Sequence, residues 1–104
     1  MATQIIRGTT PVIEYTFKRV AVSDIATAIV TIKQGTEILI EKDKSQAEVG
    51  ETTISWKLTQ EETLTPNNGS GSIMLNWLLE DGTRGASNNQ KVEFVDNHID
   101  EVIE

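Results

Sequence analysis

The sequence predicts an all-β protein, an antiparallel β-sandwich of about seven to eight short strands with one or two short helical turns. Isoleucine, valine and threonine make up 33 of the 104 residues. Side chains branched at Cβ pack well on a pleated sheet and lose rotamer freedom in a helix. Apolar and polar residues also alternate in segments 13–18, 53–58 and 72–80. This period of two places one apolar face of each strand against a core.

Turn residues divide the chain into segments that fit single strands. The predicted strands are 3–7, 11–18, 27–34, 37–43, 52–58, 71–80, 83–88 and 91–95. A break at 8–11 splits one segment into two short strands. The proline at the end of the break has no backbone donor, which fits a strand at the edge of a sheet. Gly35-Thr36 predicts a tight hairpin, and so does Asp81-Gly82, which is expected to take positive φ at both residues.

Two segments favour a single helical turn over a strand. Residues 23–26 form one turn if Ser23 is the N-cap. Thr59 precedes Glu62 by three residues, which is the spacing of a capping box. Pro66 limits that second helix to about one turn and opens the loop 66–69.

The apolar faces of these strands define the predicted core between two sheets. Its members are Tyr15, Phe17, Val30, Ile32, Ile38, Ile40, Ile54, Trp56, Leu58, Ile73, Leu75, Trp77, Val92 and Phe94. Met74 and Leu78 fall on the opposite face of the 71–80 strand. Adjacent apolar side chains on an outer face are typical of a contact surface. They are the predicted protein-interaction residues, although cover by the C-terminal segment would equally explain them.

Composition excludes several classes of site and partner. With no cysteine, the chain has no disulfide, thiolate zinc site, redox motif or cysteine nucleophile. Its apolar runs are far shorter than the ~20 residues that cross a membrane. The first residues lack the basic and apolar regions of a secretory signal, so we expect none. The formal net charge of −7 argues against binding to nucleic acid through phosphates.

The negative charge is concentrated at the C-terminal end. Residues 92–104 contain five acidic side chains and no lysine or arginine, so residues 1–91 carry −7 − (−5) = −2. We therefore expect a near-neutral sandwich domain at 1–95 and an acidic tail at 96–104. Ile99, Val102 and Ile103 interleave with the charges of this tail at helix-like spacing. The tail is either disordered or docked on the sandwich or on a partner.

No group of residues predicts catalysis or a cofactor. His98 has acidic neighbours, yet a solvated chain end explains them better than a metal site does. The carboxylates of Glu61 and Glu62 diverge by about 100° on a helical turn, and the helix dipole accounts for them. The glycine-rich loop 67–71 lacks the lysine and following helix of a phosphate-binding loop. Trp56 and Trp77 lie on predicted core faces, which favours packing over sugar stacking.

Three stretches of the chain, spanning about residues 5–95, resemble a known group of proteins. They are Arg7-Gly8-Thr9-Thr10-Pro11 leading into Ile13-Glu14-Tyr15-Thr16-Phe17, then Leu58-Thr59-Gln60-Glu61-Glu62-Thr63-Leu64, then Asp81-Gly82-Thr83-Arg84-Gly85-Ala86-Ser87-Asn88. Their order resembles small tail- or baseplate-associated β-sandwich proteins of phages and prophages of Gram-positive bacteria. It is similar to the N-terminal domain of siphophage baseplate upper proteins.

The resemblance implies an immunoglobulin-like sandwich in which 59–63 forms a short helix between two strands. It also implies a non-enzymatic structural or assembly protein, made in the bacterial host cytoplasm and located in the virion. Its partners would be other virion proteins, with a homo-oligomer possible, and neither nucleic acid, membrane nor small-molecule substrate. Baseplate upper proteins continue into long further domains, whereas this sequence ends at Glu104. A carbohydrate-binding module that contacts the host cell wall is the alternative function, and an enzyme is a third.

Overall fold

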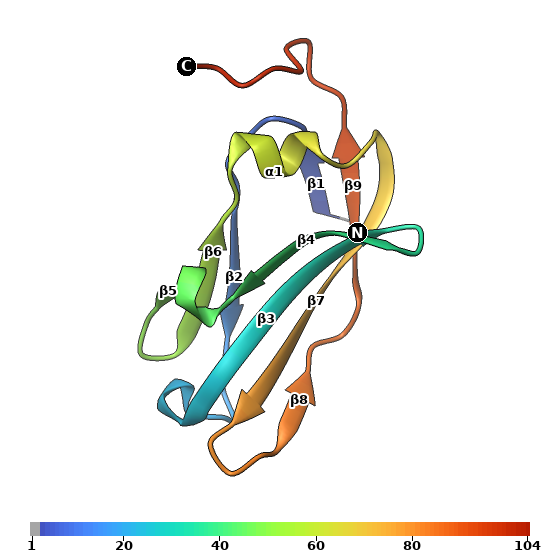
Figure 1. The fold of residues 1–104 in the computed structure, drawn as a ribbon. Helices are drawn as coiled ribbons and strands as arrows, with labels where there is room; N and C mark the ends of the chain where they lie inside the picture. Colours follow the sequence, from blue (N-terminus) through green and yellow to red (C-terminus); the bar gives the residue numbers. More distant parts are fainter. Residues whose placement is uncertain (1–2) are drawn as a thin grey trace.

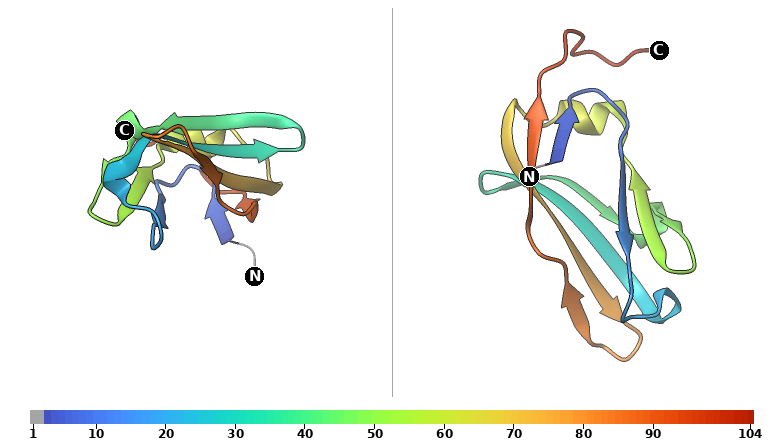
Figure 2. Two further views of the ribbon diagram at one scale, coloured as in Figure 1. Left: turned by 90° about the horizontal axis from the view of Figure 1, so that it is seen from below. Right: turned by 180° about the vertical axis from the view of Figure 1, so that it is seen from behind.

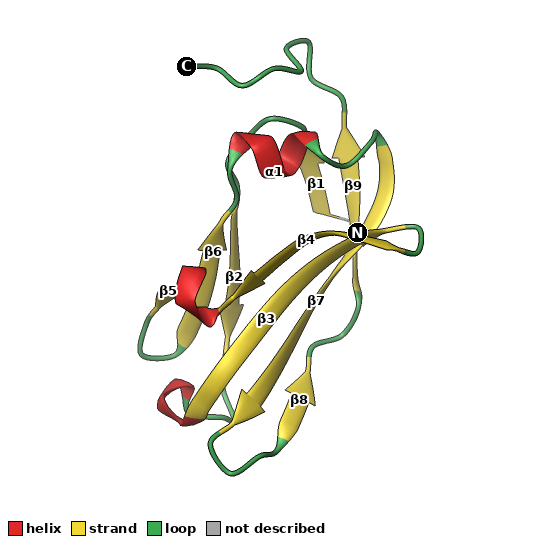
Figure 3. Cartoon of the chain, viewed as in Figure 1, coloured by secondary structure: helices red, strands yellow, loops and turns green. Residues whose placement is uncertain are grey.

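A computed structural model describes residues 3–104 as two β-sheets packed face to face, with short helical segments at their ends (Figures 1 and 3). The elements are β1 (Thr3–Ile6), β2 (Val12–Thr16), η1 (Val22–Asp24), β3 (Ile25–Gln34), β4 (Glu37–Asp43), η2 (Lys44–Gln46), β5 (Glu48–Val49), β6 (Thr53–Lys57), α1 (Gln60–Leu64), β7 (Gly69–Leu79), β8 (Arg84–Ala86) and β9 (Gln90–Val95). All eight predicted strands occur, with ends within two residues of those expected. The 3₁₀ turn η2 and the two-residue strand β5 were not predicted.

The larger sheet has the strand order β1-β9-β7-β3-β4, with β8 also paired to β7, and the smaller sheet has the order β2-β6-β5. Neighbouring strands are antiparallel except β1 and β9, which are parallel. The consecutive strands β1 and β2 belong to different sheets, as the views in Figure 2 show. The chain crosses between them at 8–11, where Gly8 takes a φ of 85°. The predicted break in an edge segment is therefore confirmed.

The two predicted hairpins differ in their turns. Gly35 has a φ of 65° in the two-residue loop between β3 and β4, as a tight hairpin requires. At Asp81-Gly82 only the glycine has a positive φ, of 89°, so the expected positive φ at Asp81 is wrong. The loop has three residues, because the Leu79 N–H donates to the Thr83 carbonyl at 2.8 Å. A type I turn closed by a left-handed glycine fits this length.

The helix α1 begins as the capping box predicts. The Glu62 N–H donates to Thr59 Oγ1 at 3.1 Å, and the Thr59 N–H donates to Glu62 Oε1 at 2.8 Å. The predicted N-cap at Ser23 is wrong. The turn η1 starts at Val22, and its N-cap position, Ala21, makes no side-chain hydrogen bond. Val22 is only 3% exposed, so burial of this apolar side chain rather than capping fixes the turn.

The core lies between the two sheets and contains most of the predicted residues. Tyr15, Phe17 and Trp77 are half-buried against it, and Ile38 is the exception at 52% exposed. A bulge after Ile32 shifts the register of β4 by one residue. Such a shift turns successive side chains to the opposite face. Core residues that were not predicted are Ile5, Val22, Ile25 and Ala28.

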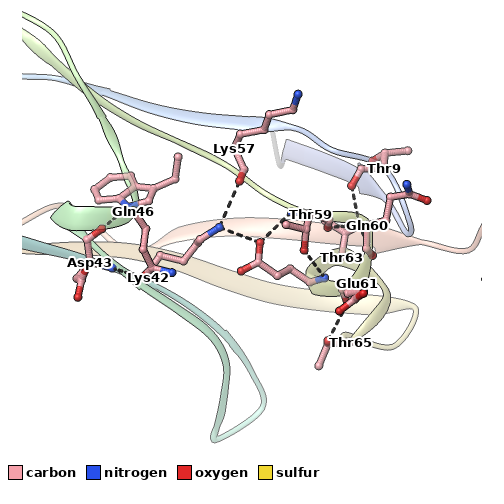
Figure 4. A network of polar contacts seen from close by, with 12 residues as sticks. Thr9, Lys42, Asp43, Gln46, Lys57, Thr59, Gln60, Glu61, Thr63 and Thr65 are labelled. Atoms are coloured by element: carbon pink, nitrogen blue, oxygen red, sulfur yellow. Dashed lines mark hydrogen bonds and ion pairs between the residues drawn. The ribbon is translucent and has the colours of Figure 1, made fainter. Parts of the chain in front are cut away.

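An ion pair joins α1 to the edge strand β4 across the gap between the sheets. The Lys42 ammonium lies 2.9 Å from Glu62 Oε1 and 3.3 Å from the Lys57 carbonyl oxygen (Figure 4). The Lys42 side chain is 9% exposed and that of Glu62 is 26% exposed. Nearby, Trp56 Nε1 donates to the Asp43 carbonyl at 2.9 Å. These contacts bind β4 of the larger sheet to β6 and α1.

Candidate functional site

The outer face of the larger sheet carries a row of apolar and small polar side chains along β3 and β7. On both strands the inward residues are buried in the core, so the alternate residues point away from it. We call these outward residues the outer stripe. Its members are Thr27, Ile29 and Thr31 on β3, and Met74, Asn76 and Leu78 on β7.

Strand pairing brings the two predicted contact residues, Met74 and Leu78, into this stripe with Ile29. Thr27 is paired with Leu78, Ile29 with Asn76, and Thr31 with Met74. Leu78 is 39% exposed, and Met74 and Ile29 are half-buried. A shallow depression of about 260 Å³ lies over part of the stripe. It is lined by Thr27, Ile29, Asn76, Trp77, Leu78 and Arg84.

Charges of opposite sign flank the outer stripe. On the β4 side, Glu41 and Asp43 are exposed and lie opposite Thr31 and Ile29. On the other side, Arg84 of β8 is paired with Leu78, and Lys91 of β9 is paired with Ser72. Arg84 donates to Asn76 Oδ1 at 3.2 Å, and the Lys91 ammonium lies 3.4 Å from the Glu93 carboxylate. The sheet face thus has Glu41 and Asp43 on one side of its apolar centre, which we call the acidic flank. The other side, which we call the basic flank, has Arg84 and Lys91, with Glu93 beside Lys91.

The C-terminal tail lies at the α1 end of the sandwich and not on the outer stripe (Figure 1). Gln60 of α1 forms two hydrogen bonds with the Ile103 backbone, at 2.8 Å to the N–H and 3.1 Å to the carbonyl. Asn97 donates to the Arg7 carbonyl at 2.9 Å. The helix-like spacing of the tail yields no helix, and 96–104 forms no regular element. Among the alternatives for Met74 and Leu78, cover by this segment does not occur in the structure.

Arg7 fixes the start of the tail to the loop after α1. Its guanidinium donates to the Leu64 and Pro66 carbonyls, each at 2.7 Å, and lies 3.2 Å from Asp96 Oδ1. The Arg7 side chain is only 18% exposed, so these bonds compensate for much of its lost hydration. The arrangement is structural, because each of the three guanidinium nitrogens donates to a group of this chain.

The residues considered for chemistry do not converge. His98, Asp100 and Glu101 are exposed in the tail, while Asp96 faces Arg7. Within residues 3–104, no three histidine or acidic side chains are grouped as a metal ion would require. Glu61 and Glu62 both lie in the first turn of α1, and only Glu62 pairs with Lys42.

Glu62 is a partly buried acid whose pKa is shifted by the fold. Partial burial acts to raise the pKa of Glu62. The Thr59 backbone N–H, the Lys42 ammonium and the Thr59 hydroxyl together outweigh that effect and hold the pKa below its ordinary value of 4.5. A carboxylate that is ionised and paired in this way is suited to anchoring β4, not to acid catalysis.

Both tryptophans lie where the sequence places them, in or against the core. Trp56 is fully buried, and Tyr15 packs edge-on against it with ring centroids 6.4 Å apart. Trp77 packs edge-on against Phe17 with centroids 5.3 Å apart. Gly85, paired with Trp77 on β8, leaves room for the indole. Both rings thus pack against other aromatic side chains, although Trp77 is also among the residues that line the depression over the outer stripe.

The sequence singled out Met74 and Leu78 but missed Ile29 and the charged flanks. Ile29 lies in the apolar run Ala28–Ile29–Val30. The sequence alone does not show which of these three side chains points outward, because that depends on how the strand pairs with its neighbours. The flanking charges come from segments 41–43, 84 and 91, which only the sheet order brings around one stripe. No helix of the described residues 3–104 is long and apolar enough to cross a membrane.

Comparison with solved structures shows the fold. CopC from Methylosinus trichosporium OB3b is similar in structure, with a TM-score of 0.60 and 12% sequence identity, over 94% of this chain and 87% of CopC. Murine CRIg aligns over 92% of each chain, with a TM-score of 0.43 and 9% identity. No protein-family model and no curated protein matches the sequence. The chain is an immunoglobulin-like β-sandwich, as predicted.

Proposed function

We propose that this chain is a non-enzymatic structural or assembly protein of a phage or prophage, acting through protein–protein contacts in a tail or baseplate. The observation that supports contact as its function is the outer stripe, where Ile29, Met74 and Leu78 lie together on an open sheet face. The setting in a tail or baseplate comes from the resemblance of segments 7–17, 58–64 and 81–88 to such proteins. Its partners are then other virion proteins, and its location is the virion.

A direct test is capture of tail and baseplate proteins encoded beside the gene by the purified, immobilised chain. The wild type is compared with Leu78→Asp, which places a charge in the stripe, and with Val12→Asp as a control. Val12 is 60% exposed on β2 of the other sheet, so this control adds the same charge to an exposed apolar strand position. We expect Leu78→Asp to reduce capture at least tenfold and Val12→Asp to leave it unchanged. Equal capture by all three proteins would refute a role for the stripe.

The alternative, a carbohydrate-binding module, requires exposed aromatic rings for stacking on sugars. The burial of Trp56 and the packing of Trp77 against Phe17 argue against it. Binding to cell-wall glycans on an array, lost on substitution of an outer-stripe residue, would favour this alternative over the protein-contact function.

A further inference from the structure

The charges beside the outer stripe follow a definite order along the strands. Directly paired residues form rows across the sheet, and four successive rows each hold one flanking charge. The first row holds Thr27, Leu78 and the base Arg84, and the second row holds Ile29, Asn76 and the acid Asp43. The third row holds Thr31, Met74 and the acid Glu41, and the fourth row holds Lys33, Ser72 and the base Lys91. The two acids occupy the middle rows on one flank, and the two bases occupy the outer rows on the other.

We propose that the outer stripe binds a second copy of this chain in a two-fold symmetric dimer, which rests on the proposed function in protein–protein contact. Two sheets can stack face to face about a two-fold axis that lies between them and runs along the strands. That operation places β3 of each copy over β7 of the other, and β4 over the β8–β9 flank. The acidic flank of each copy then faces the basic flank of its partner. Such an isologous contact uses the same patch twice.

The row order makes the charges complementary in this arrangement. Asp43 faces a position one row from Arg84 of the other copy, and Glu41 faces a position one row from Lys91. One row is about 7 Å along a strand, a span that the long side chains of arginine and lysine can cover. The stripe supplies the centre, where Thr27 faces Leu78 and Thr31 faces Met74.

The other simple arrangement is disfavoured by the same charges. A two-fold axis running across the strands would place β4 of one copy over β4 of the other. The acids Glu41 and Asp43 would then face the same two acids of the other copy, and like charges brought together oppose association. The base nearest to them, Lys44, is already hydrogen-bonded to the Ile25 carbonyl at 2.6 Å. The distribution of charge therefore selects the axis along the strands.

The size of the face predicts a weak dimer. Four strands spaced about 4.8 Å apart and seven residues long cover about 450 Å² per copy. A standard stable interface takes about 800 Å² from each partner. We therefore expect a dissociation constant of about 0.1–1 mM, which corresponds to self-association at high local concentration.

Sedimentation equilibrium and NMR diffusion of the full chain, from about 0.05 to 2 mM, test this. Reversal of either charge, Lys91→Glu or Glu41→Lys, is expected to raise the dissociation constant at least fivefold. The double variant, which exchanges the signs, is expected to return it to within about twofold of the wild type. The control Lys57→Glu makes the same change in net charge as Lys91→Glu, on exposed β6 of the other sheet.

A wild-type chain that stays monomeric at 2 mM would overturn the proposal, and so would a double variant no better than the single ones. Both results are independent of the proposed function. If the chain is monomeric while Leu78→Asp still abolishes capture of a tail protein, the second copy is refuted and the proposed function stands. If the dimer forms as described and no virion protein is captured, the proposed function fails alone.

Discussion

Neutralising Glu62 should destabilise the fold more than removing its partner Lys42. In Glu62→Gln the ammonium of Lys42, whose side chain is only 9% exposed, remains between the sheets with only neutral acceptors. In Lys42→Met the charge is gone. Glu62 keeps the Thr59 N–H at 2.8 Å and its contact with solvent, since its side chain is 26% exposed. The two variants thus remove the same ion pair and leave different unpaired charges.

The geometry sets the magnitude of this difference. At 2.9 Å and an effective dielectric constant of about 20, the attraction is about 6 kcal/mol, most of which offsets the dehydration of Lys42. Breaking a fully buried pair costs about 3–5 kcal/mol, and an exposed pair contributes about 0.5 kcal/mol. With one partner buried and the other partly exposed, we expect Glu62→Gln to cost about 2–3 kcal/mol. Lys42→Met should cost about 1 kcal/mol or less.

Urea unfolding followed by tryptophan fluorescence measures both values. With a urea slope of about 1.5 kcal/mol per molar, Glu62→Gln should lower the midpoint by about 1.5 M. Glu93→Gln is the control, because the Lys91–Glu93 pair is exposed, and it should lower the midpoint by less than about 0.3 M. If Lys42→Met proves more destabilising than Glu62→Gln, the buried ammonium is not the dominant cost and the reasoning is wrong.

Three further predictions concern single positions. Gly85→Ala should lower the melting temperature measured by calorimetry by at least about 8 °C. The added Cβ would overlap the Trp77 indole, at a cost of about 2 kcal/mol. A smaller decrease in melting temperature would contradict this packing. Tyr15→Phe should keep or raise the unfolding free energy, measured by urea unfolding, by up to about 1 kcal/mol. Its buried hydroxyl lies near the Ser87 side chain but makes no hydrogen bond of acceptable geometry within the described residues. The depressed pKa of Glu62 stabilises the fold above its ordinary value of 4.5, and that gain is lost as the pH falls through the folded pKa. The stability difference between wild type and Glu62→Gln should therefore shrink between about pH 5 and 3, and a constant difference would exclude this linkage.

The strands were predictable because their alternation is local. In segment 53–58, for example, every second residue is apolar, and the structure buries those residues in β6 and just beyond it. The start of α1 was equally predictable, because a capping box involves only residues 59–62. By contrast, β5 has only two residues, too few to show an alternation of apolar and polar side chains. It is a strand only because the turn after Val49 brings β6 alongside it. The capping box of α1 was thus recovered from local chemistry, whereas the similar box of Asp43 and Gln46 that starts η2 was missed. The strand β5, which depends on tertiary pairing, was missed as well.

Ile38 shows why alternation alone misplaces a side chain. Continuing the period from Ile40 puts Ile38 on the inner face. The bulge after Ile32 gives β4 an extra residue, so Leu39 packs against the core and Ile38 is exposed. A bulge depends on the fit of two strands to each other and has no sequence signal in one of them. The predicted core failed at one of the two positions where the register of the larger sheet changes.

The candidate site depends on the same distinction between local pattern and sheet order. The sequence identifies Leu78 and Met74 because they are apolar residues on the outer face of a strand, where polar residues are expected. The acids at 41 and 43 and the bases at 84 and 91 are about forty to fifty residues apart in the chain. They flank one stripe because β3 and β7 pair at the centre of the larger sheet. An apolar patch alone fits many partners, whereas opposite charges on its two sides restrict the partner to one with the reverse arrangement. A copy of the same face, turned about an axis along its strands, has that arrangement.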